Sequence, residues 1–280
     1  MSKTITVASW AILSLIFLVI NFSFFRTLRE VWTSDSEFAY GLLIPPIVAL
    51  IIWNRRRKLA SMAASPWNSG LLIVLAGCIL RILAGLSGSL VFSALAFPAS
   101  LLGIVGFLWG RQYVRVLGAP IGLLVLMAPL PSYVIGEIAW LLQIVVSTMS
   151  SYALQIIGVP VYRDGNVLVL PNFVLEVKQA CSGLRSIFAL LSLALMMGLN
   201  LERRWLFRGL LILATPVLSV GANIIRVTGT GLIAWHFGEL AANESLHAAW
   251  GVLVFLGTLW GLLKFLRLLQ WATRPNAYSH

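Results

Sequence analysis

Residues 70–109 read GLLIVLAGCILRILAGLSGSLVFSALAFPASLLGIVGFLW, two apolar runs joined by the turn Leu86-Ser87-Gly88-Ser89. Each run is long enough to cross the hydrocarbon core of a bilayer, which takes about 20 helical residues. A helix satisfies its own backbone hydrogen bonds, so such a run in lipid forms a helix. The stretch therefore predicts a membrane-spanning helical hairpin.

The rest of the chain has the same apolar character. Of its 280 residues, 60% are hydrophobic and 10% are charged, with a mean hydropathy of +0.94. A soluble domain of this size could not bury so many apolar side chains, whereas lipid accepts them. We therefore expect an all-α polytopic membrane protein with about eight transmembrane helices, in a single domain over residues 1–280. Besides the hairpin, the expected spans lie at about residues 8–25, 39–53, 114–130, 184–200, 206–224 and 248–268.

The net charge of +11 follows the expected topology. Cytoplasmic loops of membrane proteins are enriched in Lys and Arg. With residues 55–58 in the cytoplasm, both termini are predicted there too, and of the acidic residues only Glu202 is on that side. The basic charge therefore indicates orientation rather than a nucleic-acid partner. The basic residues on the cytoplasmic side are Lys3, Arg55, Arg56, Arg57, Lys58, Arg111, Arg115, Arg203, Arg204, Arg208, Lys264, Arg267 and Arg274.

The apolar segment 134–157 carries a polar stripe. Its polar members Gln143, Ser147, Ser151 and Gln155 recur at a spacing of four residues, on one helical face. Such a face suits a helix in the interface, or one packed against a polar site. A crossing here would also place the later arginines outside. We predict that the segment does not cross; an interfacial and a re-entrant helix are both open.

The stretch 158–180 resembles strand rather than helix. Asp164-Gly165-Asn166 separates short apolar runs, which is typical of a β-hairpin. We expect a small β-element on the outer face, leading into Cys181.

Residues 179–186 read QACSGLRS, between this β-element and an apolar run. Cys181 is expected at the start of a helix, with Arg185 four residues later. Helix N-termini and nearby cations stabilise the thiolate, the reactive form of cysteine. The alternatives are that Cys181 only packs as a small apolar residue and that Arg185 only pairs with lipid phosphate.

Arg226 and His247 are predicted at the same outer boundary, because a polar, Gly-rich passage from Thr228 is expected to stay outside. Helix ends meeting at one depth are typical of a site between helices. Cys181 would supply a nucleophile, His247 a general acid and base, and Arg226 a charge for an oxyanion. Alternatively, His247 is an ordinary interfacial residue, Arg226 snorkels to headgroups, and Asn223 is a packing amide.

Arg81 and the two cysteines are further candidates for chemistry. Arg81 lies within an apolar run, where an ionisable residue faces substrate, snorkels or pairs structurally. The two cysteines, Cys78 and Cys181, form no CxxC pair, and no His/Cys cluster indicates a metal. We expect no disulfide, no metal and no cofactor.

Several motifs resemble the exosortase branch of the exosortase/archaeosortase family. They are ACSGLRS at 180–186, Asn-x-x-Arg-Val at 223–227, and His247 before a last span. Earlier in the chain, YGLLIP at 40–45 and GVPV at 158–161 also resemble it, so that the similarity covers roughly residues 38–260. Two features depart from the family pattern: Lys178-Gln179 replaces an acidic pair, and Tyr40 stands where His is frequent.

The resemblance implies a multi-pass cysteine enzyme of the bacterial inner membrane, with its site facing the periplasm. Its substrates would be proteins with a C-terminal sorting signal: a Pro-Glu-Pro-type motif, a hydrophobic helix and a basic tail. Cys181, Arg226 and His247 take the catalytic roles, supported by Ser182, Gly183, Arg185, Asn223 and Arg81. Membrane lipid is the other expected partner.

Two other functions stay open from the residues alone. A transporter or lipid-binding protein would do no covalent chemistry, but it should show inverted repeats, and no convincing repeat is present. A thiol-dependent acyltransferase would proceed through a thioester, as transpeptidation does. The acceptor and the oligomeric state are not specified by the sequence.

Overall fold

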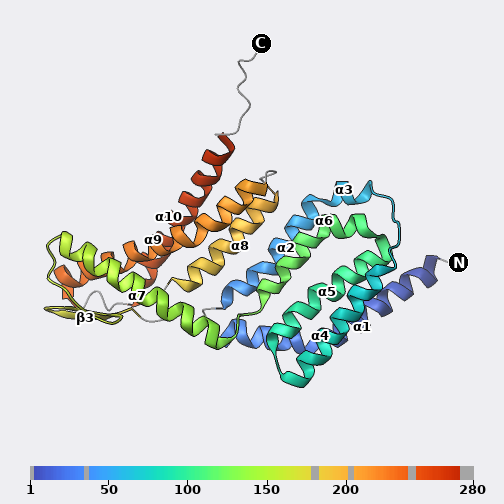
Figure 1. Ribbon diagram of the computed structural model, residues 1–280, viewed down its shortest axis with the longest axis horizontal. Coiled ribbons are helices and arrows are strands. Elements are labelled where there is room, and N and C mark those ends of the chain that lie inside the picture. Colours follow the sequence, from blue (N-terminus) through green and yellow to red (C-terminus); the bar gives the residue numbers. More distant parts are fainter. Residues whose placement is uncertain (1–2, 35–37, 178–182, 201–204, 239–243, 272–280) are drawn as a thin grey trace, which may run out of the picture. The chain divides into compact units, whose positions relative to one another are not determined.

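The computed structural model of the chain is mostly helical (Figure 1). It describes residues 3–34, 38–177, 183–200, 205–238 and 244–271. The chain forms two compact units, Met1–Leu130 and Pro131–His280.

The described regular elements of the first unit are all helices. Its elements are α1 (Lys3–Ser34), the 3-10 helix η1 (Ala39–Leu43), α2 (Ile44–Asn54), α3 (Arg56–Ala60), α4 (Ser69–Ser87), α5 (Leu90–Trp109), α6 (Arg111–Gly122) and the 3-10 helix η2 (Leu123–Met127). The predicted hairpin of residues 70–109 is present as α4 and α5, which run side by side (Figure 1). Gly88 turns the chain between them with a φ of +65°.

Glycine lets α4 and α5 approach closely. A Cβ atom at Gly103 of α5 would lie 2.5 Å from the backbone nitrogen of Val74 on α4. A Cβ at Gly77 of α4 would meet Ser100 of α5. In lipid no hydrophobic driving force brings two helices together, so their association depends on packing, and small residues allow the backbones to approach closely. Dispersion contacts between the two backbones therefore hold the hairpin together.

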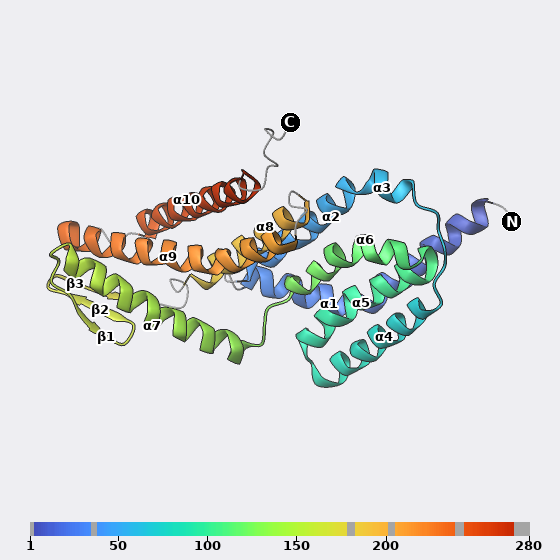
Figure 2. The same ribbon diagram turned by 45° about the horizontal axis from the view of Figure 1, so that its top comes forward.

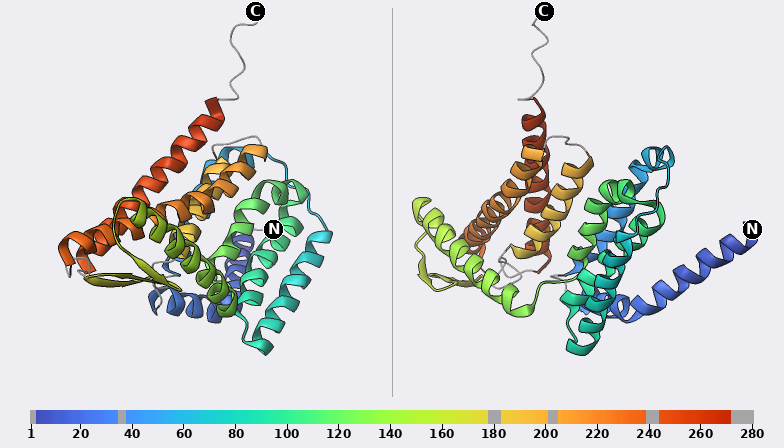
Figure 3. Two further views of the ribbon diagram at one scale, coloured as in Figure 1. Left: turned by 60° about the vertical axis from the view of Figure 1, so that its left-hand side comes forward. Right: turned by 45° about the vertical axis from the view of Figure 1, so that its right-hand side comes forward.

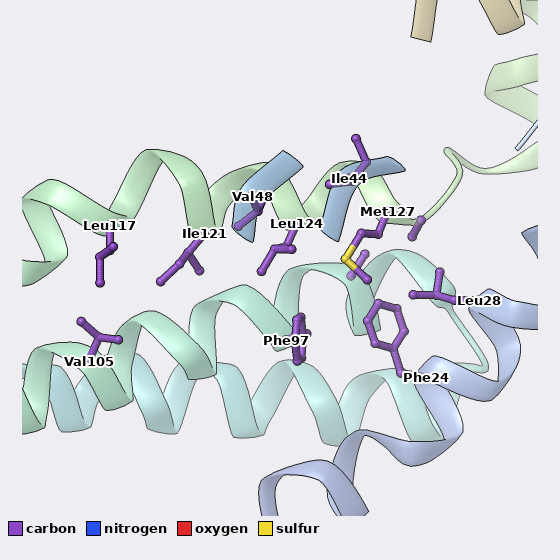
Figure 4. Packing of buried hydrophobic residues seen from close by; sticks show 12 residues of the cluster. Phe24, Leu28, Ile44, Val48, Phe97, Val105, Leu117, Ile121, Leu124 and Met127 are labelled. Carbon is purple, nitrogen blue, oxygen red and sulfur yellow. The ribbon is translucent and has the colours of Figure 1, made fainter. Parts of the chain in front are cut away.

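The core of the first unit lies where α1, α2, α5 and α6 meet (Figure 4). Phe24 and Phe97 pack with ring centroids 5.9 Å apart, and Phe25 meets Phe97 edge-on at 5.2 Å. The labelled members are all apolar: Phe24, Leu28, Ile44, Val48, Phe97, Val105, Leu117, Ile121, Leu124 and Met127.

The second unit combines long helices with a small sheet (Figure 2). Its elements are α7 (Ser132–Ile156), β1 (Tyr162–Asp164), β2 (Val167–Leu170), β3 (Phe173–Glu176), α8 (Leu184–Asn200), α9 (Trp205–Phe237) and α10 (Glu244–Trp271). α9 packs against α7, α8 and α10, so it is the central helix of this unit (Figure 3).

The predicted β-hairpin is confirmed and is one strand larger than expected. β1 and β2 pair antiparallel, with Asp164 opposite Val167, and Gly165 supplies a φ of +58° in the turn. β3 adds a third antiparallel strand, with Leu170 opposite Phe173. The expected strand region thus forms a three-stranded meander.

Five described helices are long and apolar enough to cross a membrane, so the predicted number of eight spans is not confirmed. They are α4, α5, α7, α9 and α10. The expected spans at 39–53 and 184–200 appear as shorter apolar helices. The span expected at 114–130 is divided into α6 and η2. α7 is among the five, so its length and composition also permit a crossing.

Two helices extend beyond the expected spans. α1 continues past residue 25 to Ser34, with Arg26 and Glu30 paired one turn apart at 3.1 Å. α9 continues through the Gly-rich passage from Thr228 and ends at Phe237. The passage stays helical because its glycines contact other helices: a Cβ at Gly231 would lie 2.8 Å from Leu154 of α7. Close packing there outweighs the low helix propensity of glycine.

Candidate active site

The polar stripe of α7 binds the sheet. Ser147 Oγ donates to the carbonyl oxygen of Gly165 at 3.1 Å, and Gln155 Nε2 donates to that of Val161 at 3.2 Å. Gln143 Oε1 accepts a bond of 3.2 Å from Asn166 Nδ2. The stripe therefore satisfies polar groups of the β1–β2 turn and strand ends, which would otherwise be costly to bury.

Asn166 also fixes the chain just before the cysteine motif. The backbone nitrogen of Val177 donates to Asn166 O at 2.9 Å, and Asn166 Nδ2 lies 3.2 Å from Val177 O. Val177 is 1% exposed. Residues 178–182, which include Cys181 and Ser182, lie outside the described residues. The segment that carries the predicted nucleophile thus begins at a fixed and buried point.

Gly183 fixes the other end of this segment. It is buried, has a φ of +88° and accepts the backbone hydrogen bond of Ile187, at the start of α8. A Cβ there would lie 3.1 Å from Cβ and Cγ of Asn223 on α9. Both the backbone conformation and the close neighbour favour glycine over any other residue. Gly183 is therefore packed directly against Asn223.

Asn223 and Arg226 lie about one turn apart on α9. Asn223 is 4% exposed, and the Nε atom of Arg226 is buried. The guanidinium of Arg226 lies against Gly251 of α10, where a Cβ would come within 3.0 Å of Nη2. The absence of a side chain at Gly251 leaves room for this charged group between the two helices.

Trp250 of α10 contacts α9 where the two helices pack together. Its Nε1 donates to the carbonyl oxygen of Arg226 at 3.0 Å. Its ring lies against Gly229, where a Cβ would be 2.7 Å from Cζ2. Thr230 Oγ1 donates to the same carbonyl oxygen at 3.0 Å. The backbone carbonyl of Arg226 thus accepts hydrogen bonds from two side chains, those of Trp250 and Thr230.

His247 lies in the first turn of α10, four residues before Gly251. The side chain of His247 lies outside what the structure describes. Among the predicted site residues, the structure brings Gly183 against Asn223, and it places Arg226 against Gly251 of α10.

The other predicted supporting residues lie elsewhere. Arg185 is exposed in the first turn of α8. Arg81 belongs to the first unit, where its Nη1 donates to Ser93 Oγ at 2.9 Å and its Nε to Ile20 O at 3.2 Å. It also bonds to Ser23 Oγ. These bonds join α4 to α1 and α5, which is the arrangement that structural pairing requires.

Sequence reasoning missed Trp250, Gly251 and Asn166. None of them is chemically reactive, so nothing in a list of nucleophiles and bases selects them. The spacing of Gly251 after His247 offers a clue, since a glycine one turn from a candidate base leaves space on that face. No three His, Cys, Asp or Glu side chains gather within the described residues as a metal site would need.

These elements define a multi-pass helical membrane protein with a small three-stranded sheet. The chain belongs to the transmembrane exosortase family, whose family model matches residues 32–263. The resemblance predicted for residues 38–260 is thereby confirmed. No curated protein and no solved structure matches the chain.

Proposed function

We propose that this exosortase-family protein is a cysteine endopeptidase or transpeptidase that cleaves the C-terminal sorting signals of exported proteins. Cys181 is the nucleophile, His247 the general acid and base, and Arg226 the group that stabilises the oxyanion. Asn223, Gly183, Ser182 and Arg185 support these three. The reaction takes place at the periplasmic boundary of the bacterial inner membrane, with both termini in the cytoplasm.

The observation that supports this proposal is that two elements approach α9 within about one turn: Gly183 lies against Asn223, and Gly251 of α10 lies against the Arg226 guanidinium. The last residues of the cysteine motif and the helix that carries His247 therefore meet the same part of α9. A second observation concerns depth. At about 1.5 Å per residue, Arg226 lies about 32 Å along α9 from Trp205, close to the thickness of a hydrocarbon core. Trp205 is 82% exposed, as an interfacial anchor would be.

In the first step, the Cys181 thiolate attacks the scissile carbonyl and forms a C–S bond. The oxyanion that develops lies near the Arg226 guanidinium, which stays protonated at every relevant pH. Because this guanidinium is held between α9 and α10, its charge is already oriented before the reaction. His247 in its protonated form then gives its proton to the leaving amine as the C–N bond breaks.

The second step starts from the resulting thioester. An acceptor, water or an amine, loses a proton to the neutral His247 and attacks the thioester carbonyl. Collapse of this intermediate restores the Cys181 thiolate and releases a carboxylic acid or an amide.

Substrate geometry gives a further expectation. A sorting signal with one hydrophobic helix, held by a basic cytoplasmic tail, presents its cleavage site at a depth that its helix length sets. Lengthening that helix by several residues moves the site by about 1.5 Å per residue. We expect cleavage to fall across such a series; unchanged cleavage would rule out this length measurement.

The test is Cys181→Ala and Cys181→Ser, expressed with a candidate sorting-signal substrate and followed by the gel mobility of that substrate. Cys78→Ala is the matched control, because Cys78 is exposed on α4 in the other unit. We expect both Cys181 variants to insert, accumulate and leave the substrate unprocessed, while Cys78→Ala processes it. Processing by Cys181→Ala would remove the nucleophile assignment and favour transport or lipid binding without covalent chemistry.

A further inference from the structure

A cavity of about 290 Å³ lies at one end of the α4–α5 hairpin, in the first unit. The segment before α4, the end of α5 and the beginning of α6 form its walls. The side chains that matter for its chemistry are Ser65, Trp67, Trp109, Arg111, Gln112 and Arg115.

The walls of this cavity are fixed by backbone contacts. Ser65 N donates to Trp109 O at 3.0 Å, and Trp67 N donates to Gly106 O at 3.2 Å. Gly110 adopts a φ of +102° between α5 and α6, and a Cβ there would meet the carbonyl of Ser65. The segment before α4 is therefore held against the α5–α6 corner, and the cavity does not need a ligand to form.

The cavity is strongly basic. Arg111 and Arg115 lie four residues apart on α6, so they share one face of that helix. Arg111 also lies over the Trp67 ring, with Cζ 6.0 Å from its centroid. Within the described ranges, neither guanidinium pairs with a carboxylate. The sequence explains this, since it has no Asp or Glu from residue 38 to residue 136.

The basic side chains would attract an anion, and the position of the cavity indicates that the anion belongs to a membrane lipid. α4 and α5 are long and apolar enough to span a membrane, and the cavity lies where α4 begins and α5 ends. Trp67 and Trp109 are residues typical of the headgroup level. Leu71, Leu72 and Leu75 are exposed on the first turns of α4, a few residues after Trp67, and they give this end of the helix an apolar surface. An acyl chain fits that surface, whereas a free phosphate ion gains nothing from it.

We propose that this cavity binds the phosphate ester of an anionic membrane lipid. The two guanidinium groups donate charge-assisted hydrogen bonds to the phosphate oxygens, and Gln112 and Ser65 add neutral donors. The lipid chains lie along the exposed leucines of α4. Basic pockets beside transmembrane helices commonly bind lipid headgroups in this way. The site is independent of the proposed peptidase chemistry, which belongs to the second unit.

The experiment measures the unfolding midpoint of the full chain, purified in neutral detergent, during titration with dioleoyl phosphatidylglycerol. Parallel titrations use dioleoyl phosphatidylcholine and inorganic phosphate. The test variant is Arg111→Gln/Arg115→Gln. The matched control is Arg57→Gln/Lys58→Gln, which removes the same charge from exposed positions on α3, outside the cavity lining.

We expect phosphatidylglycerol to raise the midpoint of the wild-type chain and of the control, because a ligand of the folded state stabilises it. The Arg111/Arg115 variant should bind at least about tenfold more weakly, as loss of charged hydrogen bonds implies. Arg111→Lys/Arg115→Lys, which keeps charge without the planar fork, should fall between them.

Three results would overturn the proposal. They are an unchanged phosphatidylglycerol response in the Arg111/Arg115 variant, an equal loss in the α3 control, and an equal response to phosphatidylcholine. An equal response to inorganic phosphate would overturn the lipid assignment, because the leucine surface would then contribute nothing. If the double glutamine variant does not fold, the lysine pair measured against the control decides the matter.

Discussion

The two units of this protein bury different kinds of residue. In the described part of the chain, buried polar side chains number two in the first unit, Asn21 and Ser93, and ten in the second. The first unit packs aromatic and aliphatic side chains around Phe97 (Figure 4). The ten in the second unit are Gln143, Ser147, Ser150, Ser151, Ser192, Thr215, Ser219, Asn223, Thr228 and Thr230.

This difference shows where the protein buries polar groups, which costs free energy of desolvation. Polar groups removed from water need hydrogen-bond partners, and in lipid the alternatives are few. The second unit buries polar side chains where α7 contacts the sheet and where α9 carries Asn223 and Arg226. Polar residues within membrane helices are expensive and are typical of functional sites. The comparison predicts that variants of the second unit affect processing, while equivalent variants of the first affect stability.

The largest expected contrast is between two arginines. Arg226→Gln should lower kcat/KM for substrate cleavage by about 10²–10³-fold, the usual cost of losing an oxyanion donor. Arg81→Gln removes bonds between α4, α1 and α5, so it should lower the unfolding free energy by about 1–3 kcal/mol. Its rate per folded molecule should not change. A fall in that rate would favour a substrate-facing Arg81 and remove the contrast.

The next contrast compares two glycines with positive φ. Gly183 and Gly158 have φ values of +88° and +91°, but a Cβ at Gly158 would meet nothing within 4 Å. Alanine at either position should cost about 1–2 kcal/mol of stability from the backbone alone. Gly183→Ala should in addition displace Asn223 and the end of the cysteine segment. A displacement near 1 Å costs about 10²-fold in rate.

Both glycine variants are measured for unfolding midpoint and for cleavage rate per folded molecule. Equal rates in Gly183→Ala and Gly158→Ala would show that the contact with Asn223 has no role in the site.

A smaller effect is expected at Gly251. Alanine there would bring Cβ within 3.0 Å of Arg226 Nη2, so the guanidinium must shift by a few tenths of an ångström. We expect cleavage to fall by up to about tenfold, less than for a full 1 Å displacement. Gly257→Ala, on the same helix with open space around it, is the control and should keep the wild-type rate. Equal losses in the two variants would indicate a general effect on α10.

The smallest expected effect concerns the sheet. Asn166→Ala removes side-chain bonds to Gln143 and Val177, and Asn172→Ala removes bonds to Ala234 and Trp235 on α9. Each variant should lose about 1–2 kcal/mol of stability. Only Asn166→Ala should also slow cleavage, by a few-fold, because Val177 leads into the cysteine segment. A slower Asn172→Ala enzyme of native stability would contradict this distinction.

Much of the fold could be predicted because a chain that crosses lipid can adopt few kinds of secondary structure. Apolar runs in lipid must be helical, so α4 and α5 follow from hydropathy. The Asp164-Gly165-Asn166 turn predicted β1 and β2. The third strand was missed because β3 is held by pairing with β2 and by contacts to α9, which local residues do not encode. The continuation of α9 through its Gly-rich part likewise depends on contacts with another helix, such as that of Gly231 with Leu154.

The sequence by itself determined the class of the protein, a helical membrane protein of the exosortase family. Composition and hydropathy act through solvent transfer, which is a property of each segment alone. The sequence also identified Asn223, Arg226 and His247 as candidate site residues. Only the tertiary structure decided that Gly183 packs on Asn223, that Gly251 makes room for Arg226 and that the α7 stripe binds a sheet. These are distances between residues far apart in the chain, and close packing between helices fixes them.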